Sequence, residues 1–338
     1  MHHNKRTRTR SGSQFFISIF SALIVGVGLA YGGIFASQIA SRPVAAHNES
    51  LSLSAFTEIS EEISHEEDEE DPTFISRFSR GLMYSAEESV ESEGESLTSV
   101  TNPSVSALAY SVQSLDKGNV LVEKDADRLL PIASVTKLIT AVVAKKLLDE
   151  DTMIKITSRM LSTEGNTGKL RIGEKFKVKE ILYPLLMVSS NDAAEALAQS
   201  YDATHGTGKF VKEMNAWASS IGAYRTYFRD PSGLSAHNVS TAHDISLIAQ
   251  WIRDNEPDIF DITLTKSKSI RTRTWNNPTH FLNLSSYDGG KNGYTIEAKL
   301  TSVSLFSFGS PKRYYSVVIL GSTRRDADTL AVLNKALK

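Results

Sequence analysis

A change in composition at Pro103 confines any globular fold to the C-terminal part of this 338-residue chain. Residues 41–103 are dominated by Glu and Ser, as in the stretch EEISHEEDEEDP, and contain few large apolar side chains. Such a segment cannot bury enough apolar surface to offset the entropy lost on ordering. We therefore expect a disordered acidic linker at 41–103 and one folded domain at 104–338. An acidic arm that binds a partner is the alternative.

The N-terminus has the pattern of a membrane anchor. Residues 1–14 are basic, and no charged residue occurs from Ser11 to Ser41. The 22 residues from Phe15 to Ala36 would form a helix of about 33 Å, enough to cross a hydrocarbon core of about 30 Å. The basic flank favours a cytoplasmic N-terminus.

We therefore expect a basic cytoplasmic tail at 1–14, a single transmembrane helix at 15–40, and a folded domain held outside the cytoplasm at the cell membrane. A cleaved signal peptide is the alternative, because VAA at residues 44–46 could form a cleavage site.

In the folded domain, apolar and polar residues alternate towards both ends of the sequence, and apolar residues show helical spacing in the middle. Apolar and polar residues alternate on both sides of DKGN, which predicts a hairpin. The segments KSKSIRTRT, THFLNL, GYTIEAKLTSVSLFSF and RYYSVVILGST predict strands after residue 265, whereas PIASVTKLITAVVAKKL and later segments predict helices. This order predicts an α+β fold: an antiparallel sheet from both chain ends, flanked by helices, with an inserted all-helical subdomain at about 145–262.

The amino-acid composition excludes several kinds of catalytic and metal-binding site. The chain has no cysteine, which excludes disulfides, thiolate metal sites and cysteine nucleophiles. Its net charge of −2 gives no indication of a nucleic-acid partner. The eight histidines form no H-E-x-x-H motif or other close pair of ligands. We therefore expect no metal and no cofactor, and the sequence leaves the oligomeric state open.

The segment PIASVTKLITA places Ser134 three residues before Lys137 at the start of a predicted helix. This spacing puts both side chains on one helix face. A serine hydroxyl becomes a strong nucleophile when a neighbouring base takes its proton, and a neutral lysine can be that base. The pKa of the lysine would have to fall through burial or a nearby cation. An isolated S-x-x-K is more often an ordinary solvated helix face.

Two further motifs each have an ordinary interpretation. Ser189, Ser190 and Asn191 follow the apolar run LLMV, where a hydroxyl or amide would cap a helix. The stretch YDGGKNGYT contains Lys291 and Gly293 and can be a turn between strands. It can equally place a cation beside an open strand edge that pairs with an extended peptide.

The three motifs together, in the order S-x-x-K, S-x-N and K-x-G, resemble those of the penicillin-interacting serine peptidases. From about residue 105 to the end, the chain is similar to the low-molecular-mass D-alanyl-D-alanine carboxypeptidases of that family. The segments LLPIASVTKLITA, LLMVSSNDAAEALA and FVKEMNAWASSIGAYRTYFRDPSGLSAHNVSTAHDISLIA carry the resemblance. It implies the penicillin-recognising serine hydrolase fold, with peptidoglycan stem peptides and β-lactams as partners.

The resemblance also implies a role for each matching residue. Ser134 would be the acylated nucleophile and Lys137 its base, Ser189 a proton relay, and Asn191 a residue that orients substrate and lysine. Lys291 would supply positive charge to the site. Asn292 and Arg325 would hold the substrate carboxylate, and the backbone N–H groups of Ser134 and Tyr294, next to Gly293, would bind the oxyanion.

Asn292 is a departure, because the family usually has threonine or serine at this position. An amide can still donate a hydrogen bond, from a longer side chain. The resemblance therefore favours a carboxypeptidase that removes the terminal D-alanine of stem peptides. A related endopeptidase or β-lactamase, or an inactive protein that binds the cell wall, are the alternatives.

Overall fold

The structure is a computed structural model and describes residues 104–338. The expected cytoplasmic tail at 1–14, transmembrane helix at 15–40 and acidic linker at 41–103 lie outside these residues. No helix between residues 104 and 338 is both long and apolar enough to cross a membrane.

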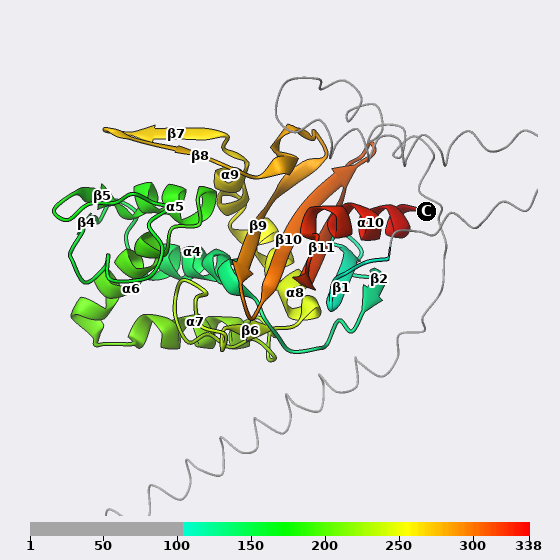
Figure 1. The fold of residues 1–338 in the computed structure, drawn as a ribbon, viewed down its shortest axis with the longest axis horizontal. Coiled ribbons are helices and arrows are strands. Elements are labelled where there is room, and N and C mark those ends of the chain that lie inside the picture. The colour runs from blue at the N-terminus through cyan, green and yellow to red at the C-terminus, as the bar shows by residue number, and fades with distance from the viewer. Residues whose placement is uncertain (1–103) are drawn as a thin grey trace, which may run out of the picture. The chain divides into compact units, whose positions relative to one another are not determined.

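A five-stranded antiparallel sheet joins the two ends of the described chain (Figure 1). Strand β1 pairs with β11 in the middle of the sheet, so residues near 110 lie beside residues near 319. The strand order is β2 (Val120–Lys124), β1 (Ala109–Ser114), β11 (Arg313–Ser322), β10 (Lys299–Phe308) and β9 (Tyr287–Thr295). Strand β9 therefore forms one edge.

Side chains alternate between two hydrophobic cores on the two faces of the sheet, because successive residues of a strand point to opposite faces. Val317 and Ile319 belong to the core under helix α10 (Arg325–Leu337). Val318 and Leu320 belong to the larger core shared with the helical part. The sheet is thus covered on both faces.

The helical part lies between residues 136 and 264 and contains six helices: α4 (Thr136–Leu147), α5 (Val178–Met187), α6 (Asn191–His205), α7 (Lys209–Ser220), α8 (Ala242–Asn255) and α9 (Asp258–Leu264). Three two-stranded sheets accompany them: β3 (Leu130–Pro131) with β6 (Val239–Ser240), β4 (Met153–Lys155) with β5 (Lys175–Lys177), and β7 (Ser267–Ile270) with β8 (Arg273–Asn276). Nine consecutive residues of α4 are buried, which makes it the central helix. The predicted α+β class, with an antiparallel sheet flanked by helices, is confirmed. The expectation that the insertion at about 145–262 is all-helical is wrong, because it also contains the β4–β5 hairpin and strand β6.

Three expected strands differ in the structure. GYTIEAKLTSVSLFSF contains the end of β9, a turn at 296–298 and all of β10. KSKSIRTRT is a hairpin, β7–β8, because Arg271 takes a left-handed backbone conformation with φ +55°. THFLNL forms the 3-10 helix η2 (His280–Asn283). The turn places Phe281 against Tyr287 and Phe306, with ring centroids 5.7 and 5.8 Å apart, so aromatic packing decides its conformation.

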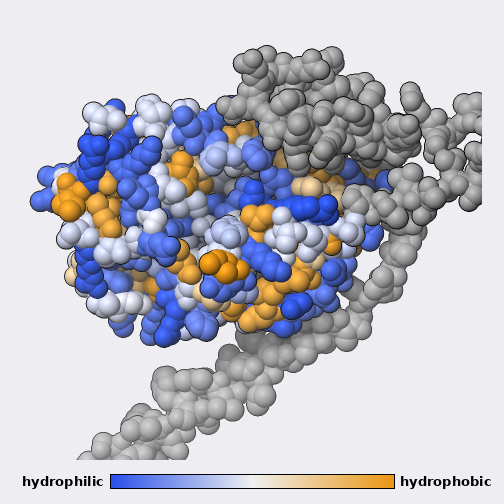
Figure 2. All heavy atoms as spheres, in the orientation of Figure 1, coloured by the Kyte–Doolittle hydropathy of each residue, from blue (hydrophilic) through white to orange (hydrophobic). Residues whose placement is uncertain are grey.

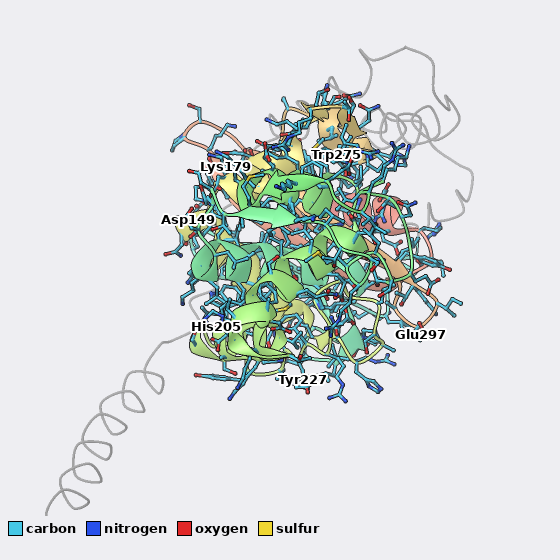
Figure 3. The ribbon with its side chains drawn as sticks, turned by 90° about the vertical axis from the view of Figure 1, so that its left-hand side faces the viewer. Asp149, Lys179, His205, Tyr227, Trp275 and Glu297 are labelled. Atoms are coloured by element: carbon cyan, nitrogen blue, oxygen red, sulfur yellow. The ribbon has the colours of Figure 1, made fainter. Side chains whose placement is uncertain are left out.

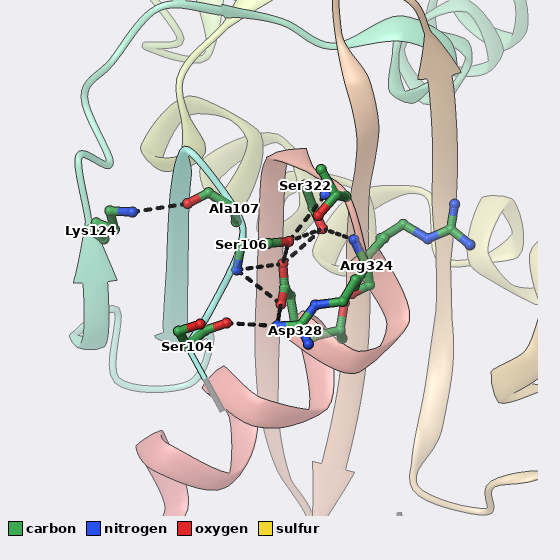
Figure 4. A network of polar contacts seen from close by, with 10 residues as sticks. Ser104, Ser106, Ala107, Lys124, Ser322, Arg324 and Asp328 are labelled. Atoms are coloured by element: carbon green, nitrogen blue, oxygen red, sulfur yellow. Dashed lines mark hydrogen bonds and ion pairs between the residues drawn. The ribbon is translucent and has the colours of Figure 1, made fainter. Parts of the chain in front are cut away.

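A buried carboxylate ties the first described residues to the end of the sheet (Figure 4). Asp328 in α10 is 1% exposed and accepts hydrogen bonds from the backbone N–H and the hydroxyl of Ser106. The Ser322 hydroxyl at the end of β11 also donates to it, at 2.8 Å. One side chain of α10 therefore satisfies three donors from two other segments.

We expect Asp328→Ala to lower the free energy of unfolding by about 2–4 kcal/mol, because buried donors lose a charged acceptor. Urea denaturation of the purified chain measures this loss. Asp254→Ala is the control, because Asp254 forms an exposed ion pair with Arg253 that should contribute less than about 1 kcal/mol. Equal losses in both variants would contradict the structural role of Asp328.

Candidate active site

Ser134 lies in a tight backbone turn at the start of the central helix. It is the middle residue of the 3-10 helix η1 (Ala133–Val135), which leads directly into α4, and Ala133 has a φ of +47°. Two glycines press against this turn. A Cβ on Gly233 would lie 2.0 Å from the Ala133 carbonyl oxygen, and one on Gly293 would lie 2.8 Å from the Ser134 nitrogen. The hydroxyl-bearing residue is therefore held between two backbone segments.

The amine of Lys137 lies directly behind Ser134 and is fully buried. Its Nζ is 2.9 Å from Oγ of Ser134, 2.8 Å from Oδ1 of Asn191 and 2.5 Å from the carbonyl oxygen of Ser232. Burial lowers the pKa of Lys137 well below its usual range, and the positive charge of Lys291 lowers it further. The two residues of the S-x-x-K motif are thus in contact, and the lysine is placed where the neutral amine is favoured.

The SSN segment serves both as a helix cap and as part of the site. Ser190 caps α6, and its hydroxyl accepts from the Ala193 N–H at 3.1 Å. Ser189 has a φ of +57°, and its buried hydroxyl has no hydrogen-bond partner among residues 104–338. Asn191 accepts from Lys137 and donates from Nδ2 to the Glu164 carbonyl at 2.6 Å. Within this motif, Ser190 therefore caps a helix, whereas Ser189 and Asn191 belong to the site.

The K-x-G motif lies on β9, the edge strand of the sheet. Lys291, Asn292 and Gly293 pair with Val303, Ser302 and Thr301 of β10, and the opposite edge of β9 pairs with no strand of the described chain. Burial and the nearby Arg325 lower the pKa of Lys291 to about 7. The site therefore contains two buried lysines, both inclined to lose their protons.

Arg325 enters the site from the first residue of α10. It lines the cleft, and its Nε donates to Oδ1 of Asp326 at 2.7 Å. His280 contacts the other oxygen of Asp326 at 2.8 Å. Arg325 is thus held in place by a neighbouring carboxylate.

A cleft of about 320 Å³ joins these parts. Eight of the nine residues expected at the site line it, namely Ser134, Ser189, Asn191, Lys291, Asn292, Gly293, Tyr294 and Arg325. The ninth, Lys137, lies buried behind Ser134. The structure therefore brings together all of the residues that the three motifs single out. No group of three His, Asp or Glu side chains in the described part of the chain could hold a metal ion.

The loop 229–238 contributes contacts that the three motifs do not include. Asp230 accepts from the backbone N–H groups of Ser232, Gly233 and Ser235 at 2.7–2.8 Å, and from the Ser232 hydroxyl. This fixes the Ser232 carbonyl against Lys137 and Gly233 against the Ser134 turn. The sequence DPSG indicates this turn, because an aspartate side chain often accepts hydrogen bonds from the backbone N–H groups of the turn residues that follow it.

Comparisons with known proteins agree with this geometry. Residues 96–323 match the family model for D-alanyl-D-alanine carboxypeptidase. The chain is 36% identical over 192 residues to a D-alanyl-D-alanine endopeptidase of Pseudomonas aeruginosa, covering 54% of this chain but only 61% of the relative. A D-alanyl-D-alanine carboxypeptidase of Streptomyces sp. (strain K15) is 30% identical over 265 residues, covering 70% of this chain and 89% of the relative.

The crystal structure of D-alanyl-D-alanine carboxypeptidase from Mycobacterium tuberculosis has the same fold. It is 29% identical with a TM-score of 0.64, covering 72% of this chain and 95% of that chain.

We expect Gly233→Ala to cost about 2–5 kcal/mol of stability, because it adds strain at φ +86° to an overlap with the Ala133 carbonyl. Gly208→Ala is a matched control: Gly208 has a φ of +77°, but nothing lies within 4 Å of its added Cβ. Its cost should be about 1–2 kcal/mol, from backbone conformation alone. Chemical denaturation of both variants measures the difference, and similar losses would show that the contact at the Ser134 turn is unimportant.

Proposed function

The chain belongs to the D-alanyl-D-alanine carboxypeptidase family, and we propose that it is a serine hydrolase that removes the terminal D-alanine of peptidoglycan stem peptides. The observation that carries the proposal is the contact between the buried amine of Lys137 and the hydroxyl of Ser134. A neutral amine has two N–H groups and one lone pair. Asn191 Oδ1 and the Ser232 carbonyl can only accept, which leaves the lone pair for the Ser134 hydroxyl.

The first half of the reaction acylates the serine. Lys137 takes the hydroxyl proton while Oγ of Ser134 attacks the carbonyl carbon of the penultimate D-alanine. The backbone N–H groups of Ser134 and Tyr294 stabilise the oxyanion. The C–N bond then breaks, and the leaving amine receives a proton through Ser189, whose hydroxyl has no partner within the described residues.

The second half hydrolyses the acyl-enzyme. A water molecule loses a proton to the amine of Lys137 and attacks the ester carbon, and the bond to Oγ of Ser134 breaks. The serine regains its proton from Lys137, and the shortened peptide leaves with a new terminal carboxylate. The same lysine therefore serves as base in both halves.

Positive charge at the end of the cleft accounts for recognition of a terminal carboxylate. Lys291 and Arg325 both line the cleft, and the pKa of Lys291 is lowered to about 7. A bound carboxylate would favour the protonated form of this lysine. Asn292 replaces the usual hydroxyl, and its amide can donate one hydrogen bond to the same carboxylate.

Endopeptidase action on cross-linked peptides is the second candidate. It uses the same acylation chemistry with a larger leaving group, and the Pseudomonas relative, at 36% identity, is called an endopeptidase. Product analysis on cross-linked and uncross-linked muropeptides distinguishes the two. Release of D-alanine alone supports the carboxypeptidase, whereas conversion of dimers to monomers supports the endopeptidase.

We also propose that residues 15–40 anchor the protein with its catalytic domain outside the cytoplasm. The support is the uncharged stretch between Ser11 and Ser41 behind a basic flank. This placement would give the active site access to the cell wall.

We expect intact cells treated with a fluorescent penicillin to yield one labelled species of this chain, in the membrane fraction. Ser134→Ala should abolish the label, because the drug is retained only as a covalent ester. A circular dichroism spectrum equal to that of the wild type is the control for folding. Undiminished labelling of the variant would refute the nucleophile, and a labelled soluble chain beginning near His47 would refute the anchor.

The pH dependence of penicillin acylation should report on Lys137, because only the neutral amine can take the serine proton. Lys291→Gln removes a cation that lowers the pKa of Lys137, so the acid limb of the rate profile should move to higher pH. Asp230→Asn removes an anion that raises this pKa, so the limb should move to lower pH. Shifts in the same direction, or none, would contradict the assignment of Lys137 as base.

A further inference from the structure

We infer that the outward face of the β4–β5 hairpin is a docking surface for the acidic segment of the same chain, residues 58–71. We call this surface the lysine face and define it as Lys155, Lys175, Lys177 and Lys179. The inference is independent of the proposed enzymatic reaction.

The hairpin directs its lysines to one side. In the β4–β5 pair, Lys155 lies opposite Lys175, and Met153 lies opposite Lys177. Ile154 and Phe176, the alternate residues, are buried in the core on the other side. Because alternate residues of a strand share a face, the lysines of both strands point outward together.

Two of the four residues of the lysine face, Lys155 and Lys175, lack a counter-charge within residues 104–338. Lys155 and Lys175 form no ion pair or hydrogen bond there, although like charges directly opposite each other destabilise a strand pair. Lys177 and Lys179 share a single carboxylate, that of Asp151, at 2.8 and 2.9 Å. The carboxylates of Glu150 and Glu180 also act on Lys179, so Lys155 and Lys175 are the two lysines of this face without a counter-charge.

The surroundings extend this positive surface. Lys169 and Arg171, in the loop that joins β4 to β5, are exposed and form no side-chain ion pair in the described part of the chain. Figure 2 shows hydrophilic side chains together with an apolar patch at the end of the domain that carries the hairpin, where Met153 and Ile172 are exposed. Figure 3, which looks onto that end, shows Lys179 near its margin. The same loop reaches the cleft through Thr167.

The charge of the chain is divided in a complementary way. Residues 104–338 contain 30 Lys and Arg against 24 Asp and Glu, whereas residues 43–103 contain fifteen acidic residues and two arginines. The segment 58–71 alone has nine acidic residues and no lysine or arginine. A chain that is nearly neutral as a whole thus combines a basic domain with a strongly acidic segment.

The connection between the two is long enough. The 33 peptide bonds that link Asp71 to Ser104 can span at most about 110–120 Å when extended. A domain of this size has a radius of gyration of about 17–18 Å, so every face is within reach. Covalent attachment also gives the segment an effective concentration on the order of millimolar, which favours it over a polyanion from solution.

Energy transfer between two dyes tests the contact in the full-length chain. The sequence has no cysteine, so Ser64→Cys in the acidic segment and Ser158→Cys beside the hairpin give two defined labelling positions. The Debye length falls from about 30 Å at 0.01 M salt to about 3 Å at 1 M. We therefore expect the transfer efficiency to fall at least about twofold between these concentrations.

Two matched variants decide where the segment binds. Lys155→Gln with Lys175→Gln should give low transfer at 0.01 M salt, whereas Lys209→Gln with Lys212→Gln, the same charge change on α7, should behave as the parent. Equal transfer in the parent and the lysine-face variant would overturn the inference. So would transfer between chains that carry only donor and only acceptor, which would mean that the segment binds a second copy. Low energy transfer in the parent would also overturn the inference if fluorescent polyphosphate binds the chain and this binding depends on Lys155 and Lys175. The lysine face would then bind an external polyanion.

Discussion

The active site depends on keeping the amine of Lys137 buried away from water and uncharged. Burying an ammonium group without a carboxylate partner is costly, so the buried lysine loses its proton instead. The structure surrounds Nζ with two acceptors, from Asn191 and Ser232, and with the positive charge of Lys291. Each of these three groups comes from a different segment. The start of α6, the loop 229–238 and strand β9 must therefore all meet at the first turn of α4.

Close backbone contacts make this meeting possible. Gly233 and Gly293 allow a loop of the helical part and a strand of the sheet to press against the same turn, where any side chain would overlap with Ala133 or Ser134. The hydroxyl therefore sits at the junction of both parts of the domain. Its position is fixed by main-chain packing, which is more rigid than packing through long side chains.

Local spacing predicts only the contact within the S-x-x-K motif, whereas the family resemblance implies the residues distant in sequence, such as Asn191 and Arg325. The three-residue spacing of Ser134 and Lys137 leads to a contact of 2.9 Å, and Lys291 and Gly293 lie on a strand edge as expected. The Ser232 carbonyl was not predicted, because a main-chain oxygen carries no residue identity and its position depends on how Asp230 folds the loop. The six residues THFLNL likewise are too few to distinguish a strand from the short 3-10 helix around Phe281, which tertiary aromatic packing stabilises.

The open edge of β9 also has a consequence for colloidal behaviour. Under the proposed function this edge would receive an extended peptide, and such an edge cannot be protected by a neighbouring strand, a bulge or a proline, which are the usual defences against edge-to-edge association. The residues that follow the motif are, moreover, exposed and apolar, with Tyr294 64% and Ile296 83% accessible. The same unpaired edge thus serves as the template for a ligand and as the weak point for self-association. An occupant of the cleft would then act as a solubility factor as well as an inhibitor or substrate.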